Sequence, residues 1–125
     1  MARYLSTEWV DALDGAAAGL DVPDDVRLVV EHVVTGGPGG EVAYHVAIAD
    51  GGARVAPGPA ATPTVTFTED YDTAVAIARG QQSAQAAFMA GRVKARGDLA
   101  TLTGHGETLG MLDEAFKAVR EDTEF

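Results

Sequence analysis

The sequence contains no cysteine, which excludes disulfide bonds, thiol nucleophiles and cysteine metal ligands across its 125 residues. It has no run of the roughly 20 apolar residues that a membrane-spanning helix needs. Its first residues, "MARYLSTEWV", lack the apolar segment of a secretory leader. We therefore expect a cytoplasmic protein with no integral membrane segment.

Aromatic residues are scarce: they make up 6% of the chain, although 46% of it is hydrophobic. Alanine and valine therefore supply much of the apolar surface, and the few large apolar side chains are the most informative about the interior. A chain of this length fits one domain, residues 1–125, that can bury a core without disulfides.

Basic residues are few, with 9 Lys and Arg against 19 Asp and Glu and a net charge of −10. A sequence-independent nucleic-acid binder needs a cationic surface that displaces counterions from phosphates. An anionic lipid surface also repels a protein of this overall charge. We therefore expect no nucleic-acid partner and no attachment to lipid headgroups by net charge alone.

The histidines are also few. His32, His45 and His105 are too far apart in sequence for a helical pair of metal ligands, so the sequence predicts no metal site and no cofactor. His32 and His45 lie in predicted strands joined by one hairpin, which makes them candidates for cross-strand neighbours. His105, between two glycines, is the residue on which an enzymatic alternative would depend, together with nearby carboxylates.

Catalytic and phosphate-binding motifs are absent. The serines Ser6 and Ser83 both precede predicted helices, where a hydroxyl accepts a hydrogen bond from a free backbone N–H. The glycines of "GGPGG", residues 36–40, lack the spacing of a dinucleotide-binding loop and indicate a hairpin turn. We therefore predict no catalytic residue and a protein that is not an enzyme.

The hydrophobic spacing changes along the chain between the periods of helices and strands. It predicts helices over 5–20, 69–80 and 83–91, strands over 26–35, 41–49, 53–56, 64–68 and 93–96, and helices from 98 towards the C-terminus. A helix, a group of strands, two helices, a returning strand and final helices indicate an α+β fold with helices on one face of one sheet.

Arg92, Lys94 and Arg96 form a cationic row at a spacing of two residues. Such a row projects from one face of a strand. One interpretation is a solvated strand face that discourages edge pairing. The other is contact with an anionic ligand head group or an acidic partner.

The stretch "AQAAFMAGRVKARGDLATL", residues 84–102, runs from an apolar helix through this basic strand to Gly-Asp and a second apolar helix. Together with "ATPTVTFTEDYDTAVAIARGQQSAQAAF", residues 61–88, it resembles the late part of the sterol carrier protein 2 (SCP2) family. The order of elements is similar over nearly the whole chain, and the sharpest part of the resemblance covers residues 62–102.

The resemblance implies a five-stranded, mostly antiparallel sheet with helices on one face and an apolar tunnel between the two layers. It implies non-catalytic binding and transfer of a small hydrophobic ligand such as a sterol, a fatty acid or an acyl-CoA. The implied ligand-binding residues are Trp9, Phe67, Phe88, Met89, Val93, Leu99 and Leu102, with Leu109, Met111, Leu112 and Phe116 as a C-terminal lid. A head group would lie near Arg92, Lys94 or Arg96.

Each of these apolar residues is also compatible with an ordinary packed core. The alternative function is a protein-interaction or regulatory module of the same fold with a filled interior. The sequence leaves the ligand, the openness of the tunnel and the oligomeric state open, a homodimer included.

Overall fold

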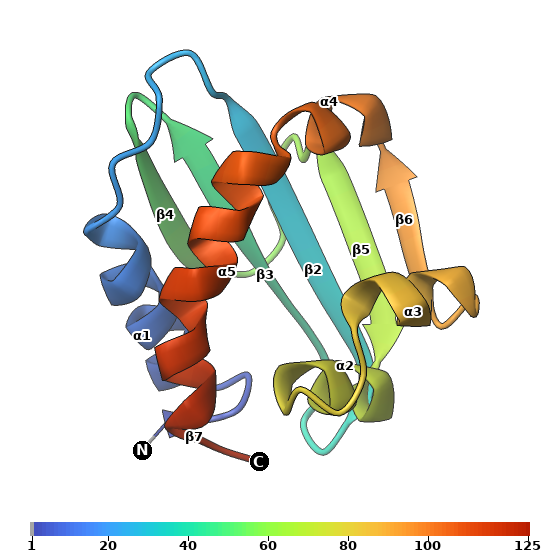
Figure 1. The fold of residues 1–125 in the computed structure, drawn as a ribbon. Helices are drawn as coiled ribbons and strands as arrows, with labels where there is room; N and C mark the ends of the chain where they lie inside the picture. Colours follow the sequence, from blue (N-terminus) through green and yellow to red (C-terminus); the bar gives the residue numbers. More distant parts are fainter. Residues whose placement is uncertain (1) are drawn as a thin grey trace.

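The computed structural model describes residues 2–125, apart from the side chains of residues 84 and 85. A five-stranded sheet in the order β4-β3-β2-β5-β6 is covered on one face by α1, α2, α3 and α5 (Figure 1). The elements are β1 (Ala2–Arg3), α1 (Thr7–Ala18), β2 (Leu28–Gly37), β3 (Gly40–Ala49), β4 (Gly52–Pro57), β5 (Val65–Asp70), α2 (Tyr71–Ala78), α3 (Ala84–Met89), β6 (Val93–Gly97), α4 (Leu99–Gly104), α5 (Gly106–Glu121) and β7 (Thr123–Glu124). The predicted α+β fold is confirmed.

The sheet is mixed, because β2 and β5 run parallel while the other neighbouring strands are antiparallel. The chain reaches β5 from the outer strand β4 by passing β3 and β2. Thr64 fixes the start of β5 next to β2, since its backbone N–H donates to the Val29 carbonyl over 2.8 Å and its hydroxyl accepts from the Val29 N–H over 3.0 Å.

The hairpin of β2 and β3 sets the register of the apolar face. Leu28 lies opposite Ile48, and Val30 lies opposite Val46. All four side chains are buried, as the alternation of the sequence predicts.

The expectation that His32 and His45 are cross-strand neighbours is wrong. His32 lies opposite Tyr44, and His45 lies opposite Glu31, so the two histidines point to opposite faces of the sheet. On the outer face, the His45 Nδ1 lies 2.9 Å from the Gly58 carbonyl oxygen. The one-residue offset follows from the Gly37–Gly40 pairing and the register shift beside it, which the sequence does not reveal.

Four helices are capped by polar side chains, among them the two serines that the sequence places before helices. Ser6, Asp70, Ser83 and Asp98 each accept a hydrogen bond from a backbone N–H three residues later, at 3.2, 2.7, 3.0 and 3.0 Å. These bonds satisfy donors that a helix leaves free in its first turn. The two serines are thus engaged in capping.

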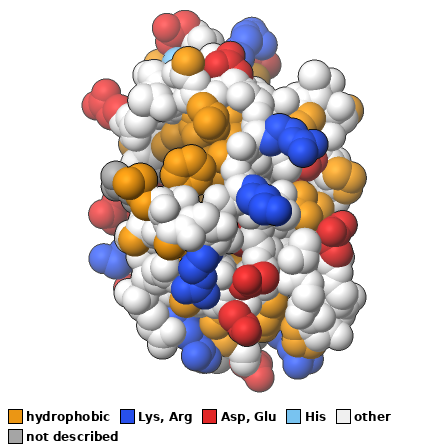
Figure 2. Space-filling view, turned by 90° about the vertical axis from the view of Figure 1, so that its right-hand side faces the viewer, with side chains coloured by type: hydrophobic (Ala, Val, Ile, Leu, Met, Phe, Trp, Pro, Cys, Tyr) orange, Lys and Arg blue, Asp and Glu red, His pale blue; other side chains and the backbone are white. Residues whose placement is uncertain are grey.

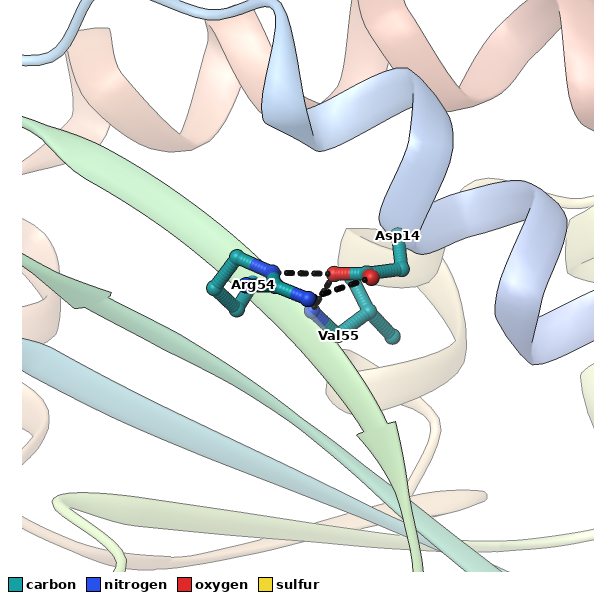
Figure 3. A network of polar contacts seen from close by, with 3 residues as sticks. All are labelled: Asp14, Arg54 and Val55. Carbon is teal, nitrogen blue, oxygen red and sulfur yellow. Dashed lines mark hydrogen bonds and ion pairs between the residues drawn. The ribbon is translucent and has the colours of Figure 1, made fainter.

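Helix α1 is fastened to the edge strand β4 by one carboxylate. Asp14 accepts from Nε and Nη2 of Arg54 over 2.9 and 3.0 Å, and from the backbone N–H of Val55 over 2.8 Å (Figure 3). The apolar side of α1, including Trp9 and Leu13, is buried in the core.

The two chain ends lie side by side, which the sequence does not predict (Figure 1). β1 and β7 pair in parallel, with Ala2 opposite Thr123 and Arg3 opposite Glu124. The indole N–H of Trp9 donates to the Thr123 hydroxyl over 3.1 Å. Strands of two residues have no recognisable sequence pattern, so only the folded arrangement reveals them.

Within residues 2–125, no helix combines the length and the apolar character needed to cross a bilayer.

Candidate functional site

A cavity of about 290 Å³ lies between the sheet and the helices. Its floor comes from β2, β3, β5 and β6, and its other walls come from α1, α2, α3 and α5. The lining residues are Tyr4, Trp9, Leu13, Val30, His32, Tyr44, Val46, Phe67, Glu69, Ala74, Ile77, Ala78, Phe88, Val93, Leu109, Leu112, Asp113, Phe116 and Arg120. Apolar side chains form most of this wall.

Aromatic rings form a row across the floor of the cavity. His32 on β2 lies beside Tyr44 on β3 and Phe67 on β5 in the strand register. Its imidazole stacks on both rings, with centroid distances of 4.9 and 5.7 Å. Trp9 meets Tyr44 edge to face at 5.3 Å, which connects this row to α1. This part of the floor is therefore largely aromatic.

Burial controls the charge of the groups that face the cavity. Desolvation lowers the pKa of His32 to about 4, so its imidazole is neutral at physiological pH. Desolvation also raises the pKa of Tyr4 and of Tyr44, and the nearby Glu69 carboxylate adds to both shifts. The Glu69 pKa is itself raised, first by desolvation and then by Asp70. The enclosed wall therefore favours uncharged forms.

The polar end of the cavity lies along α5. Arg120 Nη2 lies 3.1 Å from Asp113 Oδ1, and the two side chains are 25% and 73% exposed. Among the described lining residues, Arg120 is the one with a permanent positive charge. The cavity reaches the surface beside Asp113 and also beside Phe88, which is 46% exposed.

The structure brings seven of the eleven predicted ligand-binding residues into the cavity wall. These are Trp9, Phe67, Phe88, Val93, Leu109, Leu112 and Phe116. They come from α1, β5, α3, β6 and α5, so segments distant in sequence converge on one space.

The other four lie elsewhere. Met89 is 78% exposed and Leu99 is 38% exposed. Met89 follows Phe88, which lines the cavity, by one position in α3, and this step turns a helical side chain by about 100°. Leu99 is the first residue of α4. Leu102 packs against the core, and Met111 is half-buried next to Leu112; neither belongs to the described lining.

The three candidate head-group residues are exposed and outside the described lining. Arg92 Nη1 donates to the Gln82 side chain over 3.1 Å, while Lys94 and Arg96 lie on the edge strand β6. The basic row therefore faces the surroundings of the protein instead of the cavity.

Several lining residues carry no functional signal in the sequence. The alternation of 26–49 places His32 and Tyr44 on one strand face, but it does not show that this face borders a space. Glu69 lies two residues after Phe67 on β5, so strand alternation places it on the same face once the strand extends to that position. Tyr4 follows β1 and Arg120 lies near the end of α5, and only tertiary packing brings these two residues to the wall.

The residue of the enzymatic alternative lies apart from the cavity. His105 separates α4 from α5 and is half-buried, outside the described lining. In the part of the chain that the structure describes, no group of three or more His, Asp or Glu side chains is arranged to hold a metal ion.

Solved structures share this architecture at low sequence identity. The solution structure of TT1886 from Thermus thermophilus, described as possibly a sterol carrier protein, has a TM-score of 0.71 and 17% identity, with 95% of this chain and 91% of that chain covered. Palmitated SCP2L2 from Aedes aegypti has a TM-score of 0.64 and 19% identity, with 86% of this chain and 94% of that chain covered.

The fold also occurs as part of a larger enzyme. A segment amounting to 13% of the sec-alkyl sulfatase PisA1 superposes on 68% of this chain with a TM-score of 0.52 and 21% identity. No curated protein matches the sequence. The sequence profile of the SCP-2 sterol transfer family matches residues 20–110, which include all five strands of the large sheet and the helices α2, α3 and α4. The chain therefore belongs to the SCP-2 sterol transfer family.

Proposed function

We propose that residues 1–125 act as one non-catalytic domain that binds a hydrophobic ligand in the cavity between sheet and helices. The observation that carries the proposal is the cavity itself, which is about 290 Å³ in volume and lined mainly by aliphatic and aromatic side chains. An apolar space of this kind favours apolar guests, because water inside it lacks hydrogen-bond partners. Membership of a sterol transfer family supports the same conclusion.

The volume favours an acyl chain over a sterol. An apolar cavity of about 150 Å³ accommodates benzene, so about 290 Å³ accommodates roughly twice as many non-hydrogen atoms, on the order of twelve. A fatty acid of medium length has this size, whereas a sterol is more than twice as large. The palmitated state of the Aedes aegypti relative agrees with an acyl ligand.

Burial of the ligand's methylene groups supplies most of the expected affinity. Each buried methylene contributes about 0.8 kcal/mol, so ten of them contribute about 8 kcal/mol before the cost of ordering. We place the carboxylate of the ligand near Arg120, the cation of the described lining, with the chain lying over the aromatic floor. Glu69, whose pKa is raised by desolvation and by Asp70, also borders this space.

Filling the cavity tests the proposal. Ala78 is a small lining residue on α2, and Ala78→Phe adds a ring to the space. We expect uptake of a fluorescent fatty acid to fall at least about tenfold, since a loss of two methylene contacts already costs about 1.6 kcal/mol. Native mass spectrometry of the freshly purified wild-type protein should show bound lipid that the variant lacks.

The matched control is Ala118→Phe, which makes the same change at an exposed position of α5. It should bind like the wild-type protein. Equal affinity for all three proteins, with folding verified by circular dichroism, would contradict binding in the cavity. A sterol that competes as well as a medium-length fatty acid would refute the size argument, and the absence of any lipid uptake would favour the interaction module.

A further inference from the structure

The floor of the cavity changes from apolar to polar along its strands. Val30 on β2 lies opposite Val46 on β3, and both are buried. Two residues further along β2, His32 lies opposite Tyr44. Glu69 on β5 continues the polar groups in the same direction, because β2 and β5 run parallel. All five residues line the cavity, so its floor has an apolar end and a polar end.

Glu69 places a carboxyl group on the helix-covered face of the sheet. Its direct neighbours on the adjacent strands are Val34 on β2 and Val93 on β6, and both valines are buried. Desolvation raises the Glu69 pKa, and Asp70 adds to the shift. A polar group in such surroundings is costly unless it has a hydrogen-bond partner.

The polar side chains at this end have no partner among the described residues. No hydrogen bond or ion pair there involves the side chains of Tyr4, His32, Tyr44 and Glu69. None of their polar atoms is sealed inside the packed core, so each one borders the cavity or its mouth. These groups are therefore available to a guest.

The same groups lie within electrostatic reach of Arg120. Desolvation is the main cause of the raised pKa of Tyr4 and of Tyr44. The Glu69 carboxylate adds to both shifts, and the Arg120 guanidinium opposes them. Both tyrosine rings also meet the Trp9 ring edge to face, at 4.9 and 5.3 Å. The polar end is thus the end at which we place the carboxylate of the ligand.

The mouth on the other side of the cavity is apolar. Phe88 contributes to the wall and is 46% exposed. Figure 2 views the molecule from the side of α3 and β6 and shows hydrophobic side chains gathered at the surface. An apolar chain end fits this side, whereas the polar part of a ligand fits the side of Arg120.

We propose that the polar end selects an acyl ligand with a hydroxyl group close to its carboxylate, and that His32, Tyr44 and Glu69 bind this hydroxyl group. The proposal rests on the binding function proposed above. An unsubstituted chain would cover these groups, remove their access to water and leave them without partners. A hydroxyl group at this position supplies the missing hydrogen bonds.

A hydroxyl group matches this end better than an amine does. The wall favours uncharged forms, and Arg120 repels a cation. A phenol, a neutral imidazole and an uncharged carboxyl group each offer a donor and an acceptor, as a hydroxyl group does. One strand spacing and two residues separate His32 from Glu69, which puts their Cα atoms roughly 8 Å apart. An oxygen atom between the two side chains is within reach of both.

Calorimetric titration of the full chain tests the selection with decanoic acid, 10-hydroxydecanoic acid and each enantiomer of 3-hydroxydecanoic acid. One ordinary hydrogen bond corresponds to about fivefold in affinity, so two bonds exceed tenfold. We expect the better 3-hydroxy enantiomer to bind at least about tenfold more tightly than decanoic acid. 10-Hydroxydecanoic acid should bind no more tightly than decanoic acid, because its hydroxyl group would lie among apolar side chains far from Arg120.

Two variants identify the residues that recognise the hydroxyl group. Tyr44→Phe should weaken binding of the 3-hydroxy acid about fivefold and leave decanoic acid unchanged. Glu69→Leu should weaken binding of the 3-hydroxy acid and strengthen that of decanoic acid, whereas a purely structural role would shift both affinities alike. The control Tyr71→Phe removes a hydroxyl group from a tyrosine outside the described lining and should change neither affinity.

The outcomes separate this proposal from the binding function itself. Equal affinity for decanoic acid and the 3-hydroxy acid would overturn the selection and leave binding in the cavity intact. No binding of any of the acids would refute both proposals. A preference that persists in Tyr44→Phe and in Glu69→Leu, with folding verified by circular dichroism, would overturn the assignment of the hydroxyl site to these residues.

Discussion

His32 lies in the wall of the cavity, with its imidazole stacked between the rings of Tyr44 and Phe67. The surface area that remains to it borders this space, so a charge there is poorly solvated. The folded protein therefore holds the imidazole neutral down to a pH of about 4, whereas the unfolded chain protonates it near 6.5. Protonation of His32 therefore favours the unfolded chain.

The stability of the protein should consequently fall as the pH drops from 6.5 towards 4, because the unfolded state binds more protons in this window. The contribution of His32 is on the order of 3 kcal/mol at the lower end. His32→Phe removes it and should flatten the pH dependence of the free energy of unfolding, measured by urea denaturation. His45→Phe, on the opposite face of the sheet, serves as the control. Parallel curves for the His32 variant and the wild-type protein would contradict the argument.

Among the contacts between secondary-structure elements, the attachment of α1 to β4 depends on Asp14 (Figure 3). Its hydrogen bonds from the Arg54 side chain and the Val55 N–H hold the pKa of the carboxyl at about 2. Arg54 is 76% exposed, so water and salt weaken its ionic attraction to Asp14. The hydrogen bond to the backbone of β4 is the more durable part of the attachment.

Asp14→Ala should lower the free energy of unfolding by about 1 kcal/mol at neutral pH, since it leaves the Val55 N–H without its acceptor. The difference from the wild-type protein should shrink as the pH falls towards 2, where the wild-type carboxyl is itself protonated. Asp50→Asn provides the comparison: it weakens the Arg27 ion pair, whose side chains are 70 and 82% exposed, and should cost less than about 0.5 kcal/mol. Equal losses in both variants would contradict the role of Asp14.

Local signals in the sequence predict the elements well. Ser6 and Ser83 cap helices as expected, because a cap depends on residues within one turn. Asp98 caps the helix predicted from residue 98, and Asp70 caps α2, which begins two residues later than predicted. Asp50 and Gly51, a dipeptide typical of tight hairpin turns, have φ of 53° and 80° between β3 and β4. The parallel pairing of β2 with β5 and the meeting of β1 with β7 join residues far apart in sequence, and no local pattern encodes them.

In the whole molecule, the cavity also combines features that the local sequence predicts with features that only tertiary packing determines. Stripes of apolar residues predict that Phe67, Leu112 and Phe116 face inward, and the family resemblance predicts that inward residues border a tunnel. Whether inward residues touch or leave a space depends on how α5 lies over the sheet. That arrangement depends on packing volumes summed over many side chains, so the sequence alone does not give the polar members of the wall.

The pairing of the chain ends attaches the C-terminal end of α5 to the rest of the protein more firmly than its N-terminal end. After its last turn, β7 pairs with β1 and Thr123 accepts from the Trp9 indole, so the C-terminal end is anchored twice. The opposite end starts at His105, which makes no side-chain capping bond in the described structure, and glycines flank it. Hydrogen exchange should therefore be faster at the amides of Leu109 and Met111 than at that of Val119. Equal rates along α5 would contradict this expectation.

The paired chain ends therefore hold the C-terminal half of α5 in place over the sheet, whereas its first turn has no such attachment. Any widening of the cavity on the α5 side would accordingly start at the glycine-flanked end.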